Sequence, residues 1–474
     1  MLFSSIPFLF YFLPCVFVLY FLVPMRWKNT VLLLASLFFY AWGEPKFVVF
    51  MLASIVQGYV LARLVEKYRA DRRRAKLFLT LSLVFSLGLL GYCKYADFFL
   101  SGFNALTGLH IPLLRVALPI GISFYTFQIL SYVVDVYRGD VKAQRNFIDL
   151  AAYVAMFPQL IAGPIVRYSD IASQLEHRTH SLADVAAGAR RFVLGLGKKV
   201  LLANVFFELI TTFKASGDRS VLFYWLYAAA CVLNIYFDFS GYSDMAIGLG
   251  RIFGFRYLEN FDYPYISASI TEFWRRWHMS LGSWFRDYVY IPLGGNRCSR
   301  VRNVWNLFVV WFLTGMWHGA SWNFVLWGLY FFVILAAEKT IGEKRLRRIP
   351  TILRRVGTML LVILGWNIFY FTDLTQLLQH FGLLFGLLGA GFSNAQTGIQ
   401  LVNNLPLLLV CAIGATSVPQ NLGNLFGGVC VQGGKRSGQI VYACVTFAFD
   451  AALLALSTIA LVGSTYNAFL YFRF

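Results

Sequence analysis

Charged residues are scarce in this chain of 474 residues. They account for 13% of the sequence, whereas hydrophobic residues account for 59% and the mean hydropathy is +0.64. A water-soluble protein of this length cannot bury so much apolar surface in one core, because part of any surface must face water. Several apolar runs instead approach the roughly 20 residues that span a bilayer. The scarcity of charge excludes a soluble globular protein and predicts an all-α, polytopic integral membrane protein.

Acidic residues are the rarer charged type: 22 Asp and Glu stand against 41 Lys and Arg, which gives a net charge of +19. In a soluble protein this excess would suggest nucleic acid as the partner. Here the basic residues gather in short loops between apolar runs, as at 25–30, 66–76, 137–146 and 339–355. That distribution is typical of cytoplasmic loops and of contact with anionic lipids. We expect membrane lipids and no nucleic acid as partners, with a polyanionic ligand at the cytoplasmic face as an alternative.

Internal repeats of the kind found in many transporters are not visible in the sequence, so residues 1–474 are expected to form a single membrane domain. The apolar runs predict roughly 11–13 membrane helices, some of them broken or re-entrant. The basic loops place both termini outside. The N-terminal run lacks a basic region and a small-residue cleavage site, and is therefore expected to be a retained helix. The predicted helices lie at about 7–24, 30–43, 47–64, 77–92, 116–136, 147–165, 191–213, 221–237, 304–337 (one or two pieces), 356–372, 376–391, 400–414 and 440–462.

Two segments, 166–200 and 255–300, are too polar to lie in hydrocarbon with free backbone groups. We expect both to be interfacial or re-entrant on the cytoplasmic side. Residues 464–474 are expected to form an outward-facing aromatic tail.

Several common catalytic motifs are missing. The seven cysteines show no CxxC pattern and no Cys/His spacing typical of metal ligands, so they are predicted to be small buried hydrophobes. His177 and His180 lie three residues apart, but no third ligand is near, and no metal site is predicted. A Walker loop, a GxGxxG unit and a GxSxG elbow are also absent, so the sequence does not support a serine hydrolase or a nucleotide-binding fold.

One of only six histidines, His318, stands in an apolar run that contains no Lys, Arg, Asp or Glu between residues 304 and 337. A titratable group inside a membrane is more often functional than not. Imidazole can accept a proton from a hydroxyl at neutral pH without strong tuning of its pKa. Trp317 and Trp322 could form the walls of a slot around it. The alternative is a histidine that only packs helices together.

His278 lies in the stretch TEFWRRWHMS, among Arg275, Arg276 and Arg286. One hypothesis is a cytoplasmic-side pocket whose arginines hold phosphates. The alternative is an amphipathic interfacial helix with its arginines among the headgroups.

Two aspartates, Asp238 and Asp244, stand among aromatic and small residues in NIYFDFSGYSD. Because a carboxylate at a membrane edge needs a partner, we expect a structural ion pair with an arginine.

Long strings of the chain resemble the membrane-bound O-acyltransferase family, in particular its bacterial branch typified by the membrane subunit of alginate O-acetyltransferase. They are the opening MLFSSIPFLFYFLP, FPQLIAGPIVRYSDI at 157–171, the stretch 234–297 and WFLTGMWHGASWNFVLWG at 311–328. The resemblance implies a bacterial inner-membrane acyltransferase with a central tunnel. The near-invariant histidine of the family corresponds to His318, and its second, more variable polar position corresponds to His278.

The resemblance also implies the reaction. An acetyl group would pass from a cytoplasmic donor, expected to be acetyl-CoA, across the membrane for esterification of a polysaccharide such as alginate, another exopolysaccharide or peptidoglycan. Acetyl-CoA would be a substrate, and no permanently bound cofactor is expected. A periplasmic, hydrolase-like partner of the SGNH type would complete the transfer.

The aromatic C-terminus adds a further hypothesis. Because related envelope acylation systems carry a C-terminal aromatic motif with a tyrosine, Tyr471 could accept the acetyl group near His318 and pass it on. The alternative for Tyr471 is an interfacial anchor. For the whole chain, the alternatives to an enzyme are a proton-coupled transporter and a noncatalytic scaffold of a polysaccharide-export complex.

Overall fold

The computed structural model describes residues 2–161, 163–389, 391–431, 436–463 and 469. These residues form helices and loops, and their only β-type pairing is an isolated bridge between Phe261 and Trp277. Helices satisfy their backbone hydrogen bonds within one segment, which is the requirement that a bilayer imposes. The predicted all-α architecture is confirmed.

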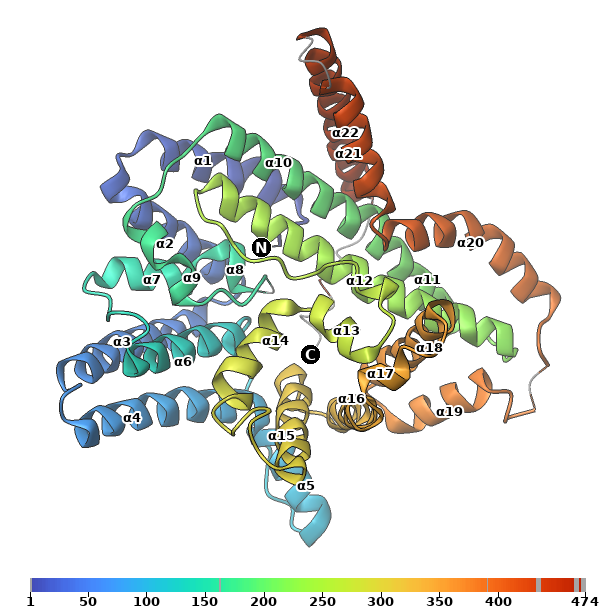
Figure 1. Cartoon of the computed structure of the whole chain (residues 1–474), viewed down its shortest axis with the longest axis horizontal. Coiled ribbons are helices and arrows are strands. Elements are labelled where there is room, and N and C mark those ends of the chain that lie inside the picture. The colour runs from blue at the N-terminus through green and yellow to red at the C-terminus, as the bar shows by residue number, and fades with distance from the viewer. Residues whose placement is uncertain (1, 162, 390, 432–435, 464–468, 470–474) are drawn as a thin grey trace. The chain divides into compact units, whose positions relative to one another are not determined.

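The α-helices shown in Figure 1 are α1 (Leu13–Leu22), α2 (Met25–Gly43), α3 (Val48–Lys67), α4 (Arg72–Leu90), α5 (Ala96–Thr107), α6 (Ile122–Arg138), α7 (Phe147–Ala155), α8 (Phe157–Leu160), α9 (Tyr168–Glu176), α10 (Leu182–Gly197), α11 (Asn204–Ala215), α12 (Val221–Ile252), α13 (Ile270–Arg276), α14 (Met279–Phe285), α15 (Arg300–His318), α16 (Trp322–Ile341), α17 (Glu343–Leu346), α18 (Thr351–Tyr370), α19 (Leu374–Leu384), α20 (Ala395–Gly414), α21 (Val418–Val431) and α22 (Arg436–Gly463). Shorter π- and 3-10 segments are η1 (Phe8–Phe12), η2 (Pro45–Phe47), η3 (Gly91–Tyr95), η4 (Lys198–Ala203), η5 (Pro264–Ile266) and η6 (Arg286–Tyr290).

Seven helical segments within the described ranges are long and apolar enough to cross a membrane. A chain with this many such segments is polytopic, as predicted. The larger number of spans expected from the sequence stays a prediction. The spans are Pro45–Lys67, Arg72–Thr107, Val221–Ile252, Trp322–Ile341, Thr351–Tyr370, Ala395–Gly414 and Arg436–Gly463.

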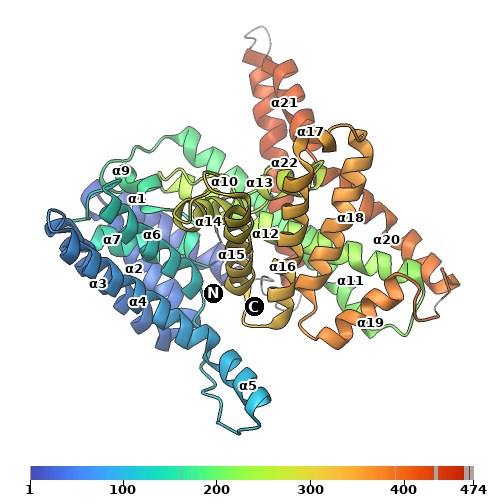
Figure 2. The ribbon, with the colours of Figure 1, turned by 60° about the horizontal axis from the view of Figure 1, so that its bottom comes forward.

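The described residues divide into two compact units. The first unit contains residues 2–192 and 242–259, and the second contains residues 193–241 and 260–469. In the first unit, α3, α4 and α6 pack on one another and α2 packs on α7 (Figure 1). A Cβ atom on Gly58 of α3 would lie 2.9 Å from Cγ2 of Ile129 on α6, so the glycine permits this close approach. Beyond α4 and η3, α5 projects from the other helices of its unit (Figure 2).

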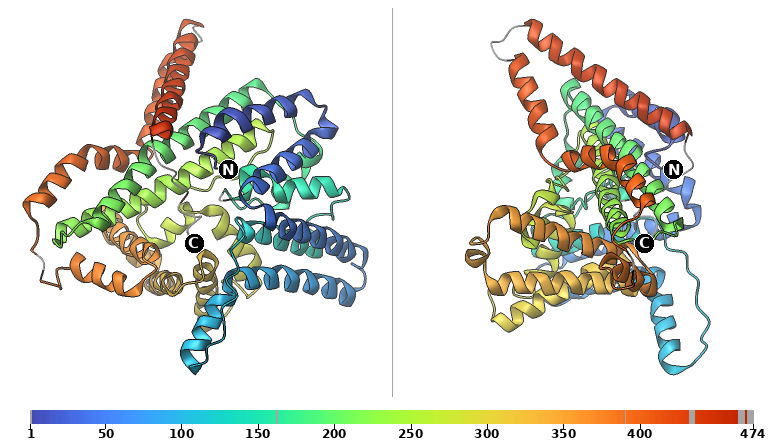
Figure 3. Two further views of the ribbon diagram at one scale, coloured as in Figure 1. Left: turned by 180° about the vertical axis from the view of Figure 1, so that it is seen from behind. Right: turned by 90° about the vertical axis from the view of Figure 1, so that its right-hand side faces the viewer.

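In the second unit, α15 and α16 form a tightly packed hairpin. A Cβ atom on Gly315 would collide with the carbonyl oxygen of Phe324, and one on Gly328 would collide with the carbonyl oxygen of Trp311. Small residues at both positions therefore bring the two backbones together. The helix α16 also packs on α18, and α13 contacts both (Figure 2). Figure 3 shows α21 and α22 as a second helical pair.

Candidate active site

His278 occupies a strained backbone position in the second unit. Its φ of 45° and ψ of 53° fall in the left-handed region, and the residue stands as the N-cap of α14 directly after α13 ends. Residues other than glycine adopt this conformation at a cost, and they keep it where the surrounding structure fixes it. The adjoining bridge between Phe261 and Trp277 and the hydrogen bond from Met279 N to Asn260 O at 3.0 Å provide that fixation. The alternative of one continuous amphipathic helix through His278 does not hold, because the helix breaks there.

The tautomer of His278 follows from its hydrogen bonds. Its Nδ1 atom lies 3.0 Å from Oδ1 of Asn260. Ser280 donates to the same Asn260 atom from its backbone N at 3.3 Å and from its hydroxyl at 2.9 Å. A backbone N–H can only donate, so the shared Asn260 atom is the amide oxygen, and Nδ1 of His278 must carry the proton that it donates. The other ring nitrogen, Nε2, is buried, has no hydrogen-bond partner among the described residues and retains its lone pair.

Aromatic rings enclose this histidine. The ring of Phe239 meets the imidazole edge-on at a centroid distance of 4.7 Å, and Trp317 lies at 5.9 Å. Burial lowers the pKa of His278 to about 3, so the ring is neutral near pH 7. A general base works best when its pKa is near the working pH. With this low pKa, His278 is better suited to accept a hydrogen bond and orient a group than to take up the proton in the reaction.

His318 is the last residue of α15 and is 7% exposed. Its ring lies at a centroid distance of 5.0 Å from each of Trp317, Trp327 and Phe369. These contacts come from α15, α16 and α18, so three helices fix the position of the imidazole. Trp317 touches both histidines and is 3% exposed. The structure thus brings both predicted histidines into contact with one buried indole ring.

Trp322, by contrast, does not enclose the site as predicted. It is 59% exposed and is the first residue of α16. The helix α15 ends at His318, and a short turn precedes α16, so Trp322 does not share the helical face of His318. Tyr471 lies outside the described residues.

Asp238 forms a buried ion pair close to the rings that surround His278. Its Oδ1 atom accepts from Nζ of Lys199 at 2.5 Å, and the two side chains are 5% and 2% exposed. The predicted arginine partner is thus a lysine. Asp238 precedes Phe239, whose ring contacts His278. Lys199 Nζ also lies 4.5 Å from the ring centre of Phe469, which is 1% exposed, so this residue of the predicted outward-facing tail is buried in the second unit.

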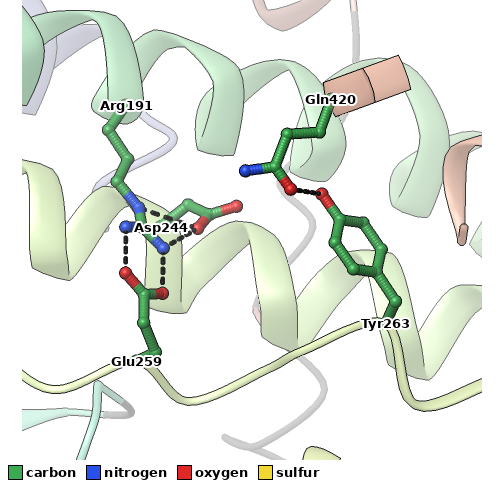
Figure 4. A network of polar contacts seen from close by, with 5 residues as sticks. All are labelled: Arg191, Asp244, Glu259, Tyr263 and Gln420. Atoms are coloured by element: carbon green, nitrogen blue, oxygen red, sulfur yellow. Dashed lines mark hydrogen bonds and ion pairs between the residues drawn. The ribbon is translucent and has the colours of Figure 1, made fainter. Parts of the chain in front are cut away.

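Asp244 takes part in a network of the first unit and does pair with an arginine. Figure 4 shows the Arg191 guanidinium between two carboxylates. Arg191 Nη2 lies 2.9 Å from Oδ1 of Asp244, and Nη1 lies 2.5 Å from Oε1 of Glu259. In the second unit, the same figure shows Tyr263 donating to Gln420 at 2.8 Å.

Two of the three candidate phosphate-binding arginines already have acidic partners. Arg276 pairs with Glu272 at 3.1 Å and with Asp262 at 3.4 Å, and Arg286 pairs with Asp287 at 2.7 Å. Arg275 is exposed and makes no ion pair with any described residue. Exposed pairs contribute little free energy and can be displaced by a phosphate. Arg275 is accordingly the most available of the three.

Four contributors to the site were not predicted: Phe239, Asn260, Trp327 and Phe369. Asn260 precedes His278 by 18 residues, and only the tertiary fold brings the two side chains together. The apolar surroundings of Trp327 and Phe369 resemble those of any membrane-helix residue, so the sequence carried no signal for them. Within the described ranges, no group of three or more His, Cys, Asp or Glu could hold a metal ion.

A buried pair of histidines in contact with one indole ring suits acyl transfer, and comparison with known proteins assigns the class. The family model for membrane-bound O-acyltransferases matches residues 141–379, a span that contains both His278 and His318. The chain belongs to the membrane-bound O-acyltransferase family and is a multi-pass membrane O-acyltransferase. This assignment favours an enzyme over the transporter and scaffold alternatives.

Particular relatives extend the comparison. A probable alginate O-acetylase of Pseudomonas aeruginosa is 46% identical over 373 residues, which are 78% of this chain and 72% of that protein. A peptidoglycan O-acetyltransferase of Helicobacter pylori is 31% identical over 517 residues, covering 100% of this chain and 98% of that protein. A teichoic acid D-alanyltransferase of Bacillus subtilis is 31% identical over 272 residues, covering 53% of this chain and 68% of that protein.

Proposed function

We propose that this enzyme takes an acetyl group from acetyl-CoA on the cytoplasmic side of the bacterial inner membrane and passes it outward for O-acetylation of a polysaccharide. The observation that carries the proposal is the pair of buried histidines whose rings both contact Trp317. The names of the relatives support acetyl as the group and an alginate-like polymer or peptidoglycan as the acceptor. The D-alanyltransferase relative supports the same chemistry with another acyl group.

The reaction needs a proton acceptor more than it needs activation, because a thioester is already reactive. In our proposal, His318 removes the proton of the attacking hydroxyl as its oxygen bonds to the thioester carbonyl carbon. The carbon–sulfur bond then breaks, and the leaving thiolate takes up the proton from His318. General-base help of this kind contributes roughly 10²–10⁴-fold to the rate. Alignment of donor and hydroxyl can contribute more.

His278 has a different part in this scheme. Its Nε2 lone pair is buried, and Asn260 fixes the tautomer that leaves this atom unprotonated. Such an atom can accept a hydrogen bond from an N–H or O–H group of the acyl donor and hold the donor in line with the attacking hydroxyl, whose single proton goes to His318. Because burial lowers the pKa of His278 to about 3, its role is orientation, whereas His318 carries the proton.

Two routes differ in the hydroxyl that accepts the acetyl group from acetyl-CoA. In the first, the polysaccharide hydroxyl reacts directly. In the second, Tyr471 accepts the acetyl group and a periplasmic SGNH-type partner passes it to the polymer, with both termini of the chain outside. The second route is supported by Phe469, two residues before Tyr471 in the sequence, which is buried beside Lys199 in the second unit.

The test compares two buried histidines. His318→Phe should abolish base-releasable acetate on the purified envelope polysaccharides of a deletion strain complemented with the variant. His380→Phe is the matched control, because His380 is 2% exposed and is likewise enclosed by aromatic rings, including Phe371 at 4.7 Å. Normal acetylation with His318→Phe would refute the assigned role of His318.

Donor and route have separate tests. Inverted membrane vesicles supplied with labelled acetyl-CoA should incorporate label, and a lack of incorporation by active membranes would contradict this donor. Tyr471→Phe keeps an aromatic anchor but removes the hydroxyl. Unchanged polymer acetylation in that variant would exclude the tyrosine route.

A further inference from the structure

A group of basic side chains surrounds Tyr20 in the first unit, apart from the two histidines. Lys28 is 8% exposed and Arg178 is 9% exposed. The Nζ atom of Lys28 lies 4.2 Å from the centre of the Tyr20 ring, and the guanidinium carbon of Arg178 lies 5.7 Å from it. Arg178 also stacks on Phe255, at 4.5 Å from that ring centre. Two cations are thus held close to one buried aromatic ring.

Neither cation has a carboxylate partner among the described residues. Arg178 donates from Nε to the Tyr20 hydroxyl at 2.9 Å and from Nη1 to Oδ1 of Asn29 at 2.7 Å. Its Nη2 atom is buried and has no hydrogen-bond partner in the described structure. Lys28 Nζ forms neither a hydrogen bond nor an ion pair with a described residue. The acid in this hydrogen-bond network, Asp149, accepts from Asn29 Nδ2 at 2.7 Å, so Arg178 is linked to it only through the Asn29 amide.

Two buried cations without an anion are energetically costly, because each loses hydration and repels the other. Proteins retain such pairs where a ligand supplies the missing negative charge. A phosphate group suits these donors, since guanidinium and ammonium groups form charge-assisted hydrogen bonds to its oxygens. Two donors remain, Lys28 Nζ and Arg178 Nη2, and the phosphate oxygens could accept hydrogen bonds from both.

The neighbouring surface indicates where the phosphate comes from. The helix α1 ends beside this group and presents exposed apolar side chains, including Leu19 at 57% and Leu22 at 77% exposed. Phe21, whose ring centre lies 5.0 Å from Lys28 Nζ, is 42% exposed. Acyl chains could lie along this apolar face while a headgroup reaches the cations. We propose that Lys28 and Arg178 bind the phosphate of an anionic phospholipid, independently of the acyl-transfer site.

The experiment measures binding of soluble, short-chain dioctanoyl phosphatidylglycerol to the purified, delipidated full-length protein by native mass spectrometry. Lys28→Met removes one cation without breaking any hydrogen bond, and the affinity for this lipid should fall at least about tenfold. Lys67→Met is the matched control, because Lys67 also lies over a tyrosine ring, that of Tyr68 at 5.5 Å, but is exposed. Its affinity should stay that of the unmodified protein.

Two further probes distinguish a phospholipid headgroup from free inorganic phosphate as the source of the phosphate. Dioctanoylglycerol, which lacks the phosphate, should bind without any dependence on Lys28. Inorganic phosphate should not displace the lipid at equal concentration, because it lacks the acyl chains. Equal lipid affinity in Lys28→Met and the unmodified protein would overturn the site. Displacement of the lipid by an equal concentration of inorganic phosphate would overturn its assignment to a lipid.

Discussion

Removal of the acceptor that fixes the tautomer of His278 should slow acetyl transfer. Asn260→Leu takes away the amide oxygen that receives the Nδ1 proton at 3.0 Å. In the variant, a buried Nδ1–H would be left unsatisfied, at a cost of about 1–3 kcal/mol. A move of the proton to Nε2 does not avoid this cost, because Nε2 is also buried without a hydrogen-bond partner among the described residues. The variant instead loses the bond that fixes both the tautomer and the direction of the ring. The reactive arrangement is then disfavoured by up to the same free energy, which corresponds to a rate loss of up to roughly 5–150-fold.

The lower end of that range applies if Ser280 replaces Asn260 as the hydrogen-bond acceptor. Its hydroxyl lies 3.4 Å from Nδ1 of His278 and could move closer to accept the proton in place of Asn260. The double variant Asn260→Leu/Ser280→Ala removes this substitute acceptor and should show the larger loss. Asn234→Leu is the control, because Asn234 is also buried and donates a single hydrogen bond to Ala203 O at 2.8 Å.

Asn260→Asp keeps an acceptor at this position but adds a negative charge beside the imidazole. This variant therefore distinguishes a role of Asn260 in orienting His278 from simple damage to the fold. A carboxylate next to the imidazole favours the charged ring and should raise its pKa by about 1–3 units from about 3. Transfer should then decline as the pH falls through about 4–6, whereas the unmodified protein shows no His278-dependent decline there. The assay is the initial rate of label transfer from acetyl-CoA in membrane vesicles from pH 4.5 to 8. Identical pH profiles for both proteins, or full activity of the double variant, would refute the role of Asn260.

Three further predictions concern the framework of the site and are checked by thermal melts in detergent. Lys199→Met removes the ammonium group that pairs with the buried Asp238 carboxylate and should cost up to about 3–5 kcal/mol, most of which Lys199→Met/Asp238→Leu should restore; equal melting of both variants would contradict this account. Gly328→Ala forces a methyl group against the Trp311 carbonyl and should cost about 1–3 kcal/mol, whereas Gly357→Ala, with open space around it, should cost far less. Burial lowers the pKa of His380 to about 4, below its unfolded value, so the neutral ring stabilises the fold fully above about pH 6.5 and progressively less as the pH falls toward 4. This amounts to about 2 kcal/mol between pH 7 and pH 5, and His380→Phe should remove that part of the acid sensitivity.

The position of His318 could be predicted from the sequence because its signal is local. An ionisable residue inside a long apolar run must be buried in a membrane protein, and the structure has it 7% exposed. The turn after Gly319 was harder to see, since the run from 304 to 337 is apolar on both sides of it. The sequence left open one helix or two, and the placement of Trp322 beside His318 failed for that reason. Its exposure of 59% follows from the new helix that starts there.

The surroundings of His278 could not be predicted, because they depend on tertiary structure. Helical periodicity through 271–280 gives no sign of a break at His278, and the sequence alone does not place this histidine in the left-handed region. Likewise, the helix predicted at 221–237 continues to Ile252, although NIYFDFSGYSD looks too polar for a membrane helix. Lys199 neutralises Asp238 within the protein, and this partner belongs to a segment 39 residues earlier. A prediction that considers only neighbouring residues cannot detect an ion pair between segments that are far apart in the sequence.

The two histidines are held by different physical means, and this difference supports different roles. His318 ends a helix and is positioned by rings from three helices, so its location is fixed without any demand on its backbone. His278 carries backbone strain and has one nitrogen committed to Asn260, so its remaining nitrogen is fixed in direction as well as in place. Strain of this kind is kept where orientation matters. Orientation of a bound acyl donor needs a fixed lone pair, whereas proton transfer needs a group that can change its charge. In the proposed mechanism, the first task therefore falls to His278 and the second to His318.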